Sequence, residues 1–155
     1  MLEVTFLRKA LTIAKEAKMQ GDLPFGCVLV DNTEAIIEEA RNTVNQDRNA
    51  IAHCELNLVQ QIAGKYSADF LQSCTIYCSV EPCPMCAGAI YWSGIGRVVF
   101  ALDTKAYNSI SQVEPGLLFE ISCKAILEKG MRSVEVLGPA LEQEAANFYR
   151  SLMDR

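Results

Sequence analysis

The chain has 155 residues, of which 50% are hydrophobic and 21% are charged, and its formal net charge is -5. This composition is typical of a soluble globular protein and excludes a disordered, collagen-like or coiled-coil chain. The length predicts a single domain over residues 1–155 with its own hydrophobic core. The acidic balance argues against a broad nucleic-acid surface, which needs clustered Lys and Arg, although a local basic groove remains compatible with it.

The first residues and the cysteines indicate where the protein works. Residues Met1–Gln20 are interrupted by charges and lack the apolar core of a signal peptide. No run of the sequence approaches the ~18 apolar residues that span a bilayer. We therefore expect a cytoplasmic protein with no membrane partner. In a reducing compartment, its seven cysteines are expected as metal ligands, catalytic thiols or core residues rather than as disulfides.

The first half of the chain predicts a helix, a hairpin and a second helix. Apolar residues from Leu7 to Ala17 recur at three- and four-residue steps, which predicts an amphipathic helix ending near Gly21. Two apolar runs, 27–30 and 36–40, predict a hairpin, and residues 42–49 form a polar loop. A helix is expected from about His53 to Gly64.

The second half alternates strands and helices. The β-branched and aromatic run Cys74–Val80 predicts a strand buried on both faces. Pro84 favours the start of a helix that runs to about Ser93. The remaining elements are expected as a strand over 97–102, a helix over 120–129, a strand over 133–137 and a helix over 141–153. This order predicts an α/β fold, with a mostly parallel sheet between two layers of helices.

A histidine and two cysteines have the spacing of a metal site. His53 is the only histidine, and Cys83 and Cys86 form a Cys-x-x-Cys pair at the start of the helix predicted from Pro84. Residues three apart lie on one side of a helical turn, so both thiolates can bind one ion. Three protein ligands leave the fourth position of a zinc ion open to water, as in catalytic sites. Glu55 is near the metal but displaced from the ligand direction, which suits a general acid/base.

These residues carry a resemblance to a known family. His53-Cys54-Glu55 with Pro82-Cys83-Pro84-Met85-Cys86 resembles the H-x-E…P-C-x-x-C signature of the cytidine and nucleobase deaminase superfamily. Over roughly residues 5–105, the chain is similar to the guanine deaminase and tRNA adenosine deaminase branch. The residues that carry this similarity are Pro24-Phe25-Gly26, Asn42 and the segment from Cys86 to Trp92.

The resemblance implies a fold, a cofactor and a mechanism. It implies a three-layer α/β/α sandwich around a mixed, mostly parallel five-stranded sheet, and a homodimer. One zinc ion per chain would supply a zinc-bound hydroxide, which attacks the amine-bearing ring carbon and releases ammonia. The site residues it implies are His53, Cys83 and Cys86 for zinc, Glu55 for proton transfer, and Asn42 and Phe25 for substrate contact. From their local sequence alone, Asn42 is also compatible with a turn residue and Phe25 with a core residue.

One position departs from the family pattern. Cys54 stands where the family more often has Ala, which makes its thiol a candidate rival to the expected zinc ligands. A helical step of about 100° should direct Cys54 away from the zinc if His53 faces it. The other cysteines are expected in the core, namely Cys27, Cys74, Cys78 and Cys123.

Three functions compete on this sequence. The protein deaminates a small amino-heterocycle such as a guanine- or cytosine-type base or nucleoside, or edits adenosine in a tRNA anticodon, or binds zinc only for structure. The segment 131–155 has three basic and four acidic residues, whereas the tRNA enzymes usually end in a basic helix. We therefore favour the small molecule, although a carboxylate for guanine is hard to place, since Asp103 and Glu114 are the only acids between Ala101 and Phe119.

Overall fold

The computed structural model describes residues 4–154 and is built around one five-stranded sheet. The strands are β1 (Gly26–Val30), β2 (Ile36–Arg41), β3 (Thr75–Val80), β4 (Arg97–Leu102) and β5 (Glu135–Leu137), in the spatial order β2-β1-β3-β4-β5. β1 pairs antiparallel with β2 and with β3, whereas β3, β4 and β5 pair in parallel. Four strands therefore point one way and β1 points the other, which confirms the mixed, mostly parallel sheet.

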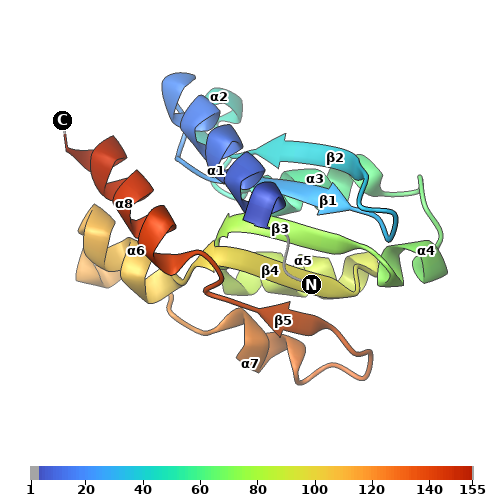
Figure 1. The fold of residues 1–155 in the computed structure, drawn as a ribbon. Helices are drawn as coiled ribbons and strands as arrows, with labels where there is room; N and C mark the ends of the chain where they lie inside the picture. The colour runs from blue at the N-terminus through green and yellow to red at the C-terminus, as the bar shows by residue number, and fades with distance from the viewer. Residues whose placement is uncertain (1–3, 155) are drawn as a thin grey trace.

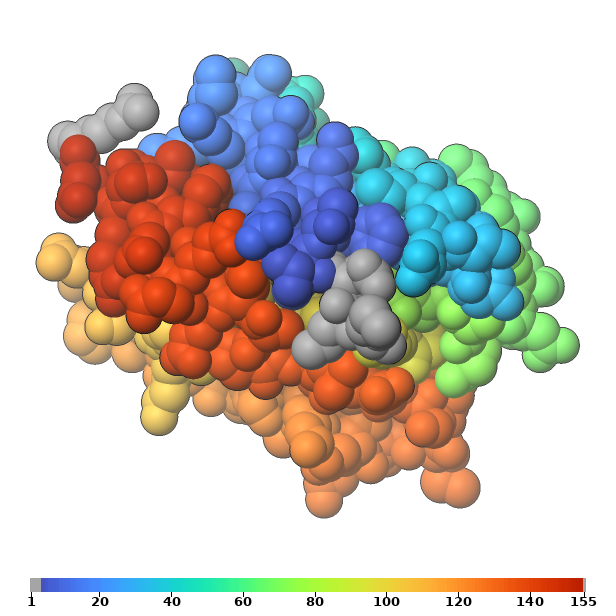
Figure 2. All heavy atoms as spheres, in the orientation of Figure 1, coloured from blue at the N-terminus to red at the C-terminus, as the bar shows by residue number. Residues whose placement is uncertain are grey.

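Helices cover both faces of the sheet (Figure 1). α1 (Val4–Met19), α6 (Thr104–Ser111) and α8 (Glu142–Met153) pack on one face, and α3 (Cys54–Ile62), α5 (Pro84–Ser93) and α7 (Cys123–Leu127) on the other. α8 lies beside α1 on the face shown in Figure 2, where Arg8 and Glu144 form an ion pair. The three-layer α/β/α arrangement is thus confirmed. Among the described residues, no helix has the length and apolar character needed to cross a membrane.

Alternation along the strands divides the core into two layers. In β1, Cys27 and Leu29 face the layer of α3 and α5, while Val28 and Val30 face the layer of α1 and α8. All six residues of β3 are buried, as predicted, because this strand is central and has helices on both faces.

Several short elements were not predicted. α2 (Val44–Asp47), α4 (Ala68–Gln72) and a 3-10 turn (Pro115–Leu117) are too short to produce a periodic pattern. α6 begins after the Asp103 cap, whose Oδ1 accepts the N–H of Ala106 at 2.7 Å, but its only buried residue is Tyr107.

Two predicted elements are shorter than expected. The helix predicted over 120–129 begins only at Cys123, because the Ser122 hydroxyl caps it by accepting the N–H of Ala125. The strand predicted from Ser133 starts at Glu135, and the Ser133 carbonyl accepts the side chain of Gln72 instead of a sheet partner. Both differences lie in the last third of the chain.

The direction of the strands brings distant segments to one edge of the sheet. β2, β3 and β4 end at this edge, and the reversed strand β1 begins there. Phe25 directly precedes β1, Asn42 follows β2, and Cys83 follows β3. The backbone N–H of Asn42 donates to the Phe25 carbonyl at 3.0 Å across this edge. Ligand sites of α/β sheets commonly lie outside the carboxyl ends of the strands.

Candidate metal centre

Three predicted ligands come together at the starts of two helices. His53 is the N-cap residue of α3, Cys83 is the N-cap residue of α5, and Cys86 lies in the first turn of α5. The Nδ1 atom of His53 lies 3.6 Å from the Sγ of Cys83 and 3.7 Å from the Sγ of Cys86. All three donor atoms lie within 4.8 Å of one another.

These distances fit a zinc ion. With Zn–S of about 2.3 Å and Zn–N of about 2.05 Å, a tetrahedral site separates sulfur from nitrogen by about 3.6 Å. The observed separations of 3.6 and 3.7 Å match this value. One imidazole and two thiolates are also a donor set that zinc prefers. His53, Cys83 and Cys86 therefore form a candidate zinc site.

The electrostatics favour a thiolate at Cys83. A hydrogen bond from Cys86 and a second from His53 lower the pKa of Cys83 to about 4. The hydrogen bond with Cys83 and burial raise the pKa of Cys86, and the hydrogen bond with Cys83 raises the pKa of His53. Thiolate is the form of cysteine that binds metals.

Cys54 does not join this cluster. Its side chain is fully buried in the core layer of α3 and α5, where its thiol is a hydrogen-bond partner of Cys27 and Glu55, and it is not one of the three clustered ligands. The helical step after His53 thus directs Cys54 into the core, as the sequence predicted. Cys27, Cys74, Cys78 and Cys123 are also buried as free thiols.

A cavity of about 560 Å³ opens beside the metal ligands. His53, Glu55, Cys83 and Phe25 are among the residues that line it. Glu55 is 6% exposed, and burial is the main cause that raises the pKa of its carboxyl group. The rest of the wall is largely apolar and includes Leu23, Val80, Tyr107, Val113, Leu117 and Phe119.

Comparison with known proteins agrees with this geometry. Residues 2–102 match the family described as the cytidine and deoxycytidylate deaminase zinc-binding region. The chain belongs to this family. It is a zinc-dependent deaminase, and the matched region contains all three candidate zinc ligands and Glu55.

Individual relatives differ in what their names describe. A probable cytosine deaminase of Schizosaccharomyces pombe is 36% identical over 155 residues, covering 98% of this chain and 93% of the relative. A tRNA-specific adenosine deaminase of Bacillus subtilis is 34% identical over 152 residues, covering 95% of this chain and 88% of the relative. The solved structure of a guanine deaminase from Nitrosomonas europaea shares the fold, with a TM-score of 0.80 at 22% identity, over 97% of this chain and 84% of that one.

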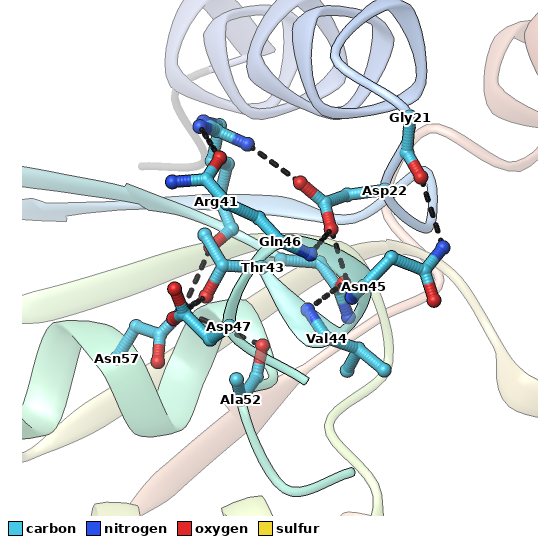
Figure 3. A network of polar contacts seen from close by, with 11 residues as sticks. Gly21, Asp22, Arg41, Thr43, Val44, Asn45, Gln46, Asp47, Ala52 and Asn57 are labelled. Carbon is cyan, nitrogen blue, oxygen red and sulfur yellow. Dashed lines mark hydrogen bonds and ion pairs between the residues drawn. The ribbon is translucent and has the colours of Figure 1, made fainter. Parts of the chain in front are cut away.

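In the deaminase, a polar network joins the turn before β1 to the segment after β2 (Figure 3). The Oδ1 of Asp22 accepts the backbone N–H groups of Asn45 and Gln46 at 2.9 and 3.0 Å, and its Oδ2 accepts Arg41 Nη1 at 2.9 Å. The N–H of Gln46 is the largest cause that lowers the pKa of Asp22. The side-chain amide of Asn57 donates to the Arg41 carbonyl at 3.0 Å. The turn before β1 is thereby fixed to the segment that leads from β2 to His53.

Asn42 lies within this segment and has an unusual environment. It is 1% exposed, and its Oδ1 accepts the N–H of Val44 at 3.0 Å. Its side-chain Nδ2 is buried without a hydrogen-bond partner among the described residues. Asn42 is not among the residues that line the cavity. Its backbone N–H donates a hydrogen bond to the carbonyl of Phe25, which does line it.

Arg132 supports α5, the helix that carries Cys86, and no sequence pattern predicts this role. Its guanidinium donates to the carbonyls of Ile95 at 2.8 Å and Gly94 at 3.2 Å, and also to that of Tyr91. These carbonyls lie at or just beyond the end of α5, where helical partners are missing. The Tyr91 hydroxyl in turn accepts the backbone N–H of Arg132 at 3.2 Å.

Five of the residues that line the cavity were also not predicted from the sequence. Tyr107 and Asn108 come from α6, and Val113, Leu117 and Phe119 from the irregular segment after it. The Asp103 cap could have revealed α6, since Asp is a favoured N-cap residue. Nothing in the local sequence indicates which of the later apolar residues face the cavity.

Proposed function

We propose that this deaminase hydrolytically removes the amino group of a small, uncharged amino-heterocycle, namely a guanine- or cytosine-type base, a nucleoside or a related ring. The observation that carries this proposal is the lining of the cavity beside the metal ligands. Among residues 4–154, no lysine or arginine lines it, and most of its wall is apolar. Apolar pockets with a few convergent polar groups are typical of small-molecule sites.

Each predicted site residue has a role in this proposal. His53, Cys83 and Cys86 would hold zinc, which when bound acidifies a water molecule and so makes a nucleophile available at neutral pH. Glu55 lies in the same cavity and would carry protons to a ring nitrogen and to the departing ammonia. Phe25 would pack against the ring.

The unsatisfied amide of Asn42 supports its proposed contact with substrate. A buried N–H group without a partner costs about 1–3 kcal/mol, so an acceptor on the ligand that reached Nδ2 would recover part of this energy. A ring carbonyl of guanine or cytosine has this chemistry. The neighbouring bond between Asn42 and the Phe25 carbonyl would couple the two substrate contacts.

Editing of adenosine in tRNA is the second candidate, favoured by the similarity to the Bacillus subtilis tRNA-specific adenosine deaminase. Binding an RNA backbone requires cations that neutralise phosphates. α8 contains Glu142, Glu144 and a single basic residue, Arg150, which donates to Asn147. Arg132 is engaged with the end of α5. These charges favour the small substrate over tRNA.

The two acids considered for a guanine site have different surroundings. Asp103 is occupied as the cap of α6, and Glu114 is exposed. Glu81 lines the cavity, but its two oxygens accept the N–H groups of Thr104 and Cys123, both at 3.0 Å. The proposal therefore includes cytosine-type rings as well as guanine as substrates.

The test is a screen for ammonia release with the zinc-loaded chain. The panel comprises free bases, nucleosides, aminotriazines and an anticodon stem-loop, and we expect turnover of at least one small ring. Turnover of the stem-loop alone would overturn the proposal in favour of tRNA editing. Absence of turnover on every member, with zinc bound, would favour a structural zinc.

A variant pair tests the role of Glu55. Glu55→Ala should keep one zinc per chain and lower kcat at least 100-fold, because general acid/base catalysis typically contributes about 10²–10⁴-fold. Glu128→Ala is the control: it changes an exposed glutamate at the end of α7, and its kcat and zinc content should equal those of the parent. Retained activity in Glu55→Ala would exclude Glu55 as the proton carrier.

We also propose that each chain is a single deaminase domain, that two chains form a homodimer, and that the protein is cytoplasmic. All seven cysteines are free thiols, which is typical of a reducing compartment. Trp92 at the end of α5 is 85% exposed, a feature often found at subunit interfaces. Sedimentation equilibrium of the purified chain measures the oligomeric state, and a monomer at micromolar concentration would contradict the dimer.

A further inference from the structure

The C-terminal helix reaches the turn that carries Phe25. Tyr149 of α8 is fully buried, and its hydroxyl donates to the Pro24 carbonyl at 2.9 Å. The two residues are 125 positions apart in the sequence, and Tyr149 lies outside residues 2–102, which match the deaminase family. Burial raises the pKa of Tyr149, so its hydroxyl remains protonated and can donate at neutral pH.

Aromatic rings continue this contact into the cavity. The Tyr149 and Tyr107 rings meet edge to face with centroids 5.1 Å apart, and Tyr107 meets Phe25 in the same manner at 4.9 Å. Phe25 and Tyr107 both line the cavity that contains His53 and Glu55. Tyr149 is not among the lining residues, so it does not touch a ligand in the cavity itself.

The other side of the turn is equally constrained. The N–H of Gly26 donates to the buried hydroxyl of Ser79 at 3.1 Å. A Cβ atom at Gly26 would lie 2.6 Å from the Ala10 carbonyl oxygen, so α1 packs directly on this backbone. The Phe25 carbonyl accepts the N–H of Asn42. On the C-terminal side of Phe25, the backbone is therefore held by contacts with β3, α1 and Asn42. On its N-terminal side, the Pro24 carbonyl is held by the Tyr149 hydroxyl.

We propose that Tyr149 is a positioning residue for deamination: its hydroxyl holds the Pro24 carbonyl, and this bond sets the place of the Phe25 ring against the substrate. The inference rests on the proposed function for its effect on turnover. It gives the C-terminal helix, which carries no zinc ligand, a part in selecting the substrate. The hydroxyl acts on substrate affinity, because a displaced wall weakens ring packing while the metal centre is unchanged.

The test compares Tyr149→Phe with Tyr66→Phe as a matched control. Tyr149→Phe removes only the hydroxyl and keeps the ring contact with Tyr107. Tyr66 stacks on Phe70 away from the cavity. On the best ring substrate, Tyr149→Phe should raise KM about three- to tenfold, the equivalent of one lost hydrogen bond, with kcat within about twofold and zinc content unchanged. Tyr66→Phe should leave both constants unchanged.

A double-mutant cycle tests whether the hydroxyl acts through Phe25. In a Phe25→Leu background, Tyr149→Phe should change KM by less than about twofold, because the ring that it positions is gone. Equal effects of Tyr149→Phe in both backgrounds would overturn the inference. So would an unchanged KM in Tyr149→Phe accompanied only by a lower melting temperature, since a merely structural residue behaves in this way.

Hydrogen exchange separates this inference from the proposed function. The N–H of Phe25 is bonded to the Leu23 carbonyl and that of Gly26 to Ser79, so both report on the turn. Tyr149→Phe should accelerate exchange in a peptide covering residues 23–27, whereas Tyr66→Phe should not. If no substrate in the screen is turned over, the proposed function fails. Faster exchange would still uphold the positioning of the turn by Tyr149, and unchanged exchange would overturn it.

Discussion

Removal of the Arg132 guanidinium should destabilise the deaminase through the end of the zinc-binding helix. Arg132→Met keeps most of the aliphatic volume and deletes the donors to the carbonyls at and just beyond the end of α5. It also deletes the cation that lies 5.0 Å from the centre of the Tyr91 ring. The carbonyl groups at a helix end would then have to find water as a partner.

The size of the effect follows from these contacts. Hydrogen bonds from a charged donor contribute about 1.5–3 kcal/mol, and a cation at a helix C-terminus adds about 0.3–1 kcal/mol. The contacts are not additive, and the site is partly solvated, so we expect a loss of about 2–3 kcal/mol in the free energy of unfolding. For a chain of this length, this corresponds to a melting temperature lower by roughly 5–10 °C.

Urea unfolding at a fixed excess of zinc measures this loss, since zinc binding itself stabilises the native state. Arg150→Met is the matched control, because Arg150 is exposed and its guanidinium donates only to Asn147 among the described partners. We expect the control to lose less than about 0.5 kcal/mol. If Arg132→Met loses no more than Arg150→Met, the assignment of Arg132 as a support for α5 is refuted.

Two further variants test the surroundings of the metal centre. Cys54→Ala should keep one zinc per chain and lose about 1 kcal/mol of stability from the small cavity in the core, as measured by metal analysis and urea unfolding; loss of zinc would show that Cys54 is a ligand. Asp22→Asn should lose about 1–3 kcal/mol at neutral pH through its weakened bonds to Arg41 and the start of α2. Because the pKa of Asp22 is lowered on folding, its contribution exists above the unfolded pKa of about 3.9 and is lost as pH falls through the folded value. The gap between parent and variant should therefore shrink near about pH 3 in the same unfolding assay, and a gap that is constant with pH would contradict this role.

The metal centre was accessible to sequence reasoning because its signals are local. Cys83 and Cys86 are three residues apart at a proline-marked helix start, and Glu55 follows His53 by two. Helix geometry alone then places Cys54 away from His53. The regular strands were equally clear, since β3 and β4 are short runs rich in β-branched and aromatic residues, and all of their residues except Arg97 are buried.

The wall of the cavity was not accessible in this way. Val113, Leu117 and Phe119 lie in a segment with no helical or strand period, so no pattern indicates which side chains face inward. In the sequence, Arg132 is one of three basic residues in the segment 131–155, but tertiary contacts with the end of α5 determine its role. The contact of Tyr149 likewise depends on α8 reaching the turn before β1, since Tyr149 and Pro24 are 125 positions apart in the sequence.

The division of the cavity between two parts of the chain has an evolutionary consequence. The candidate zinc ligands and Glu55 lie before residue 102, whereas Tyr107, Val113, Leu117 and Phe119 lie after it. Substitutions in the later part can therefore reshape the binding surface without disturbing the ligands that hold the ion. A lineage could thus exchange one amino-bearing ring for another while inheriting an intact catalytic machinery, which fits the different activities named among its relatives.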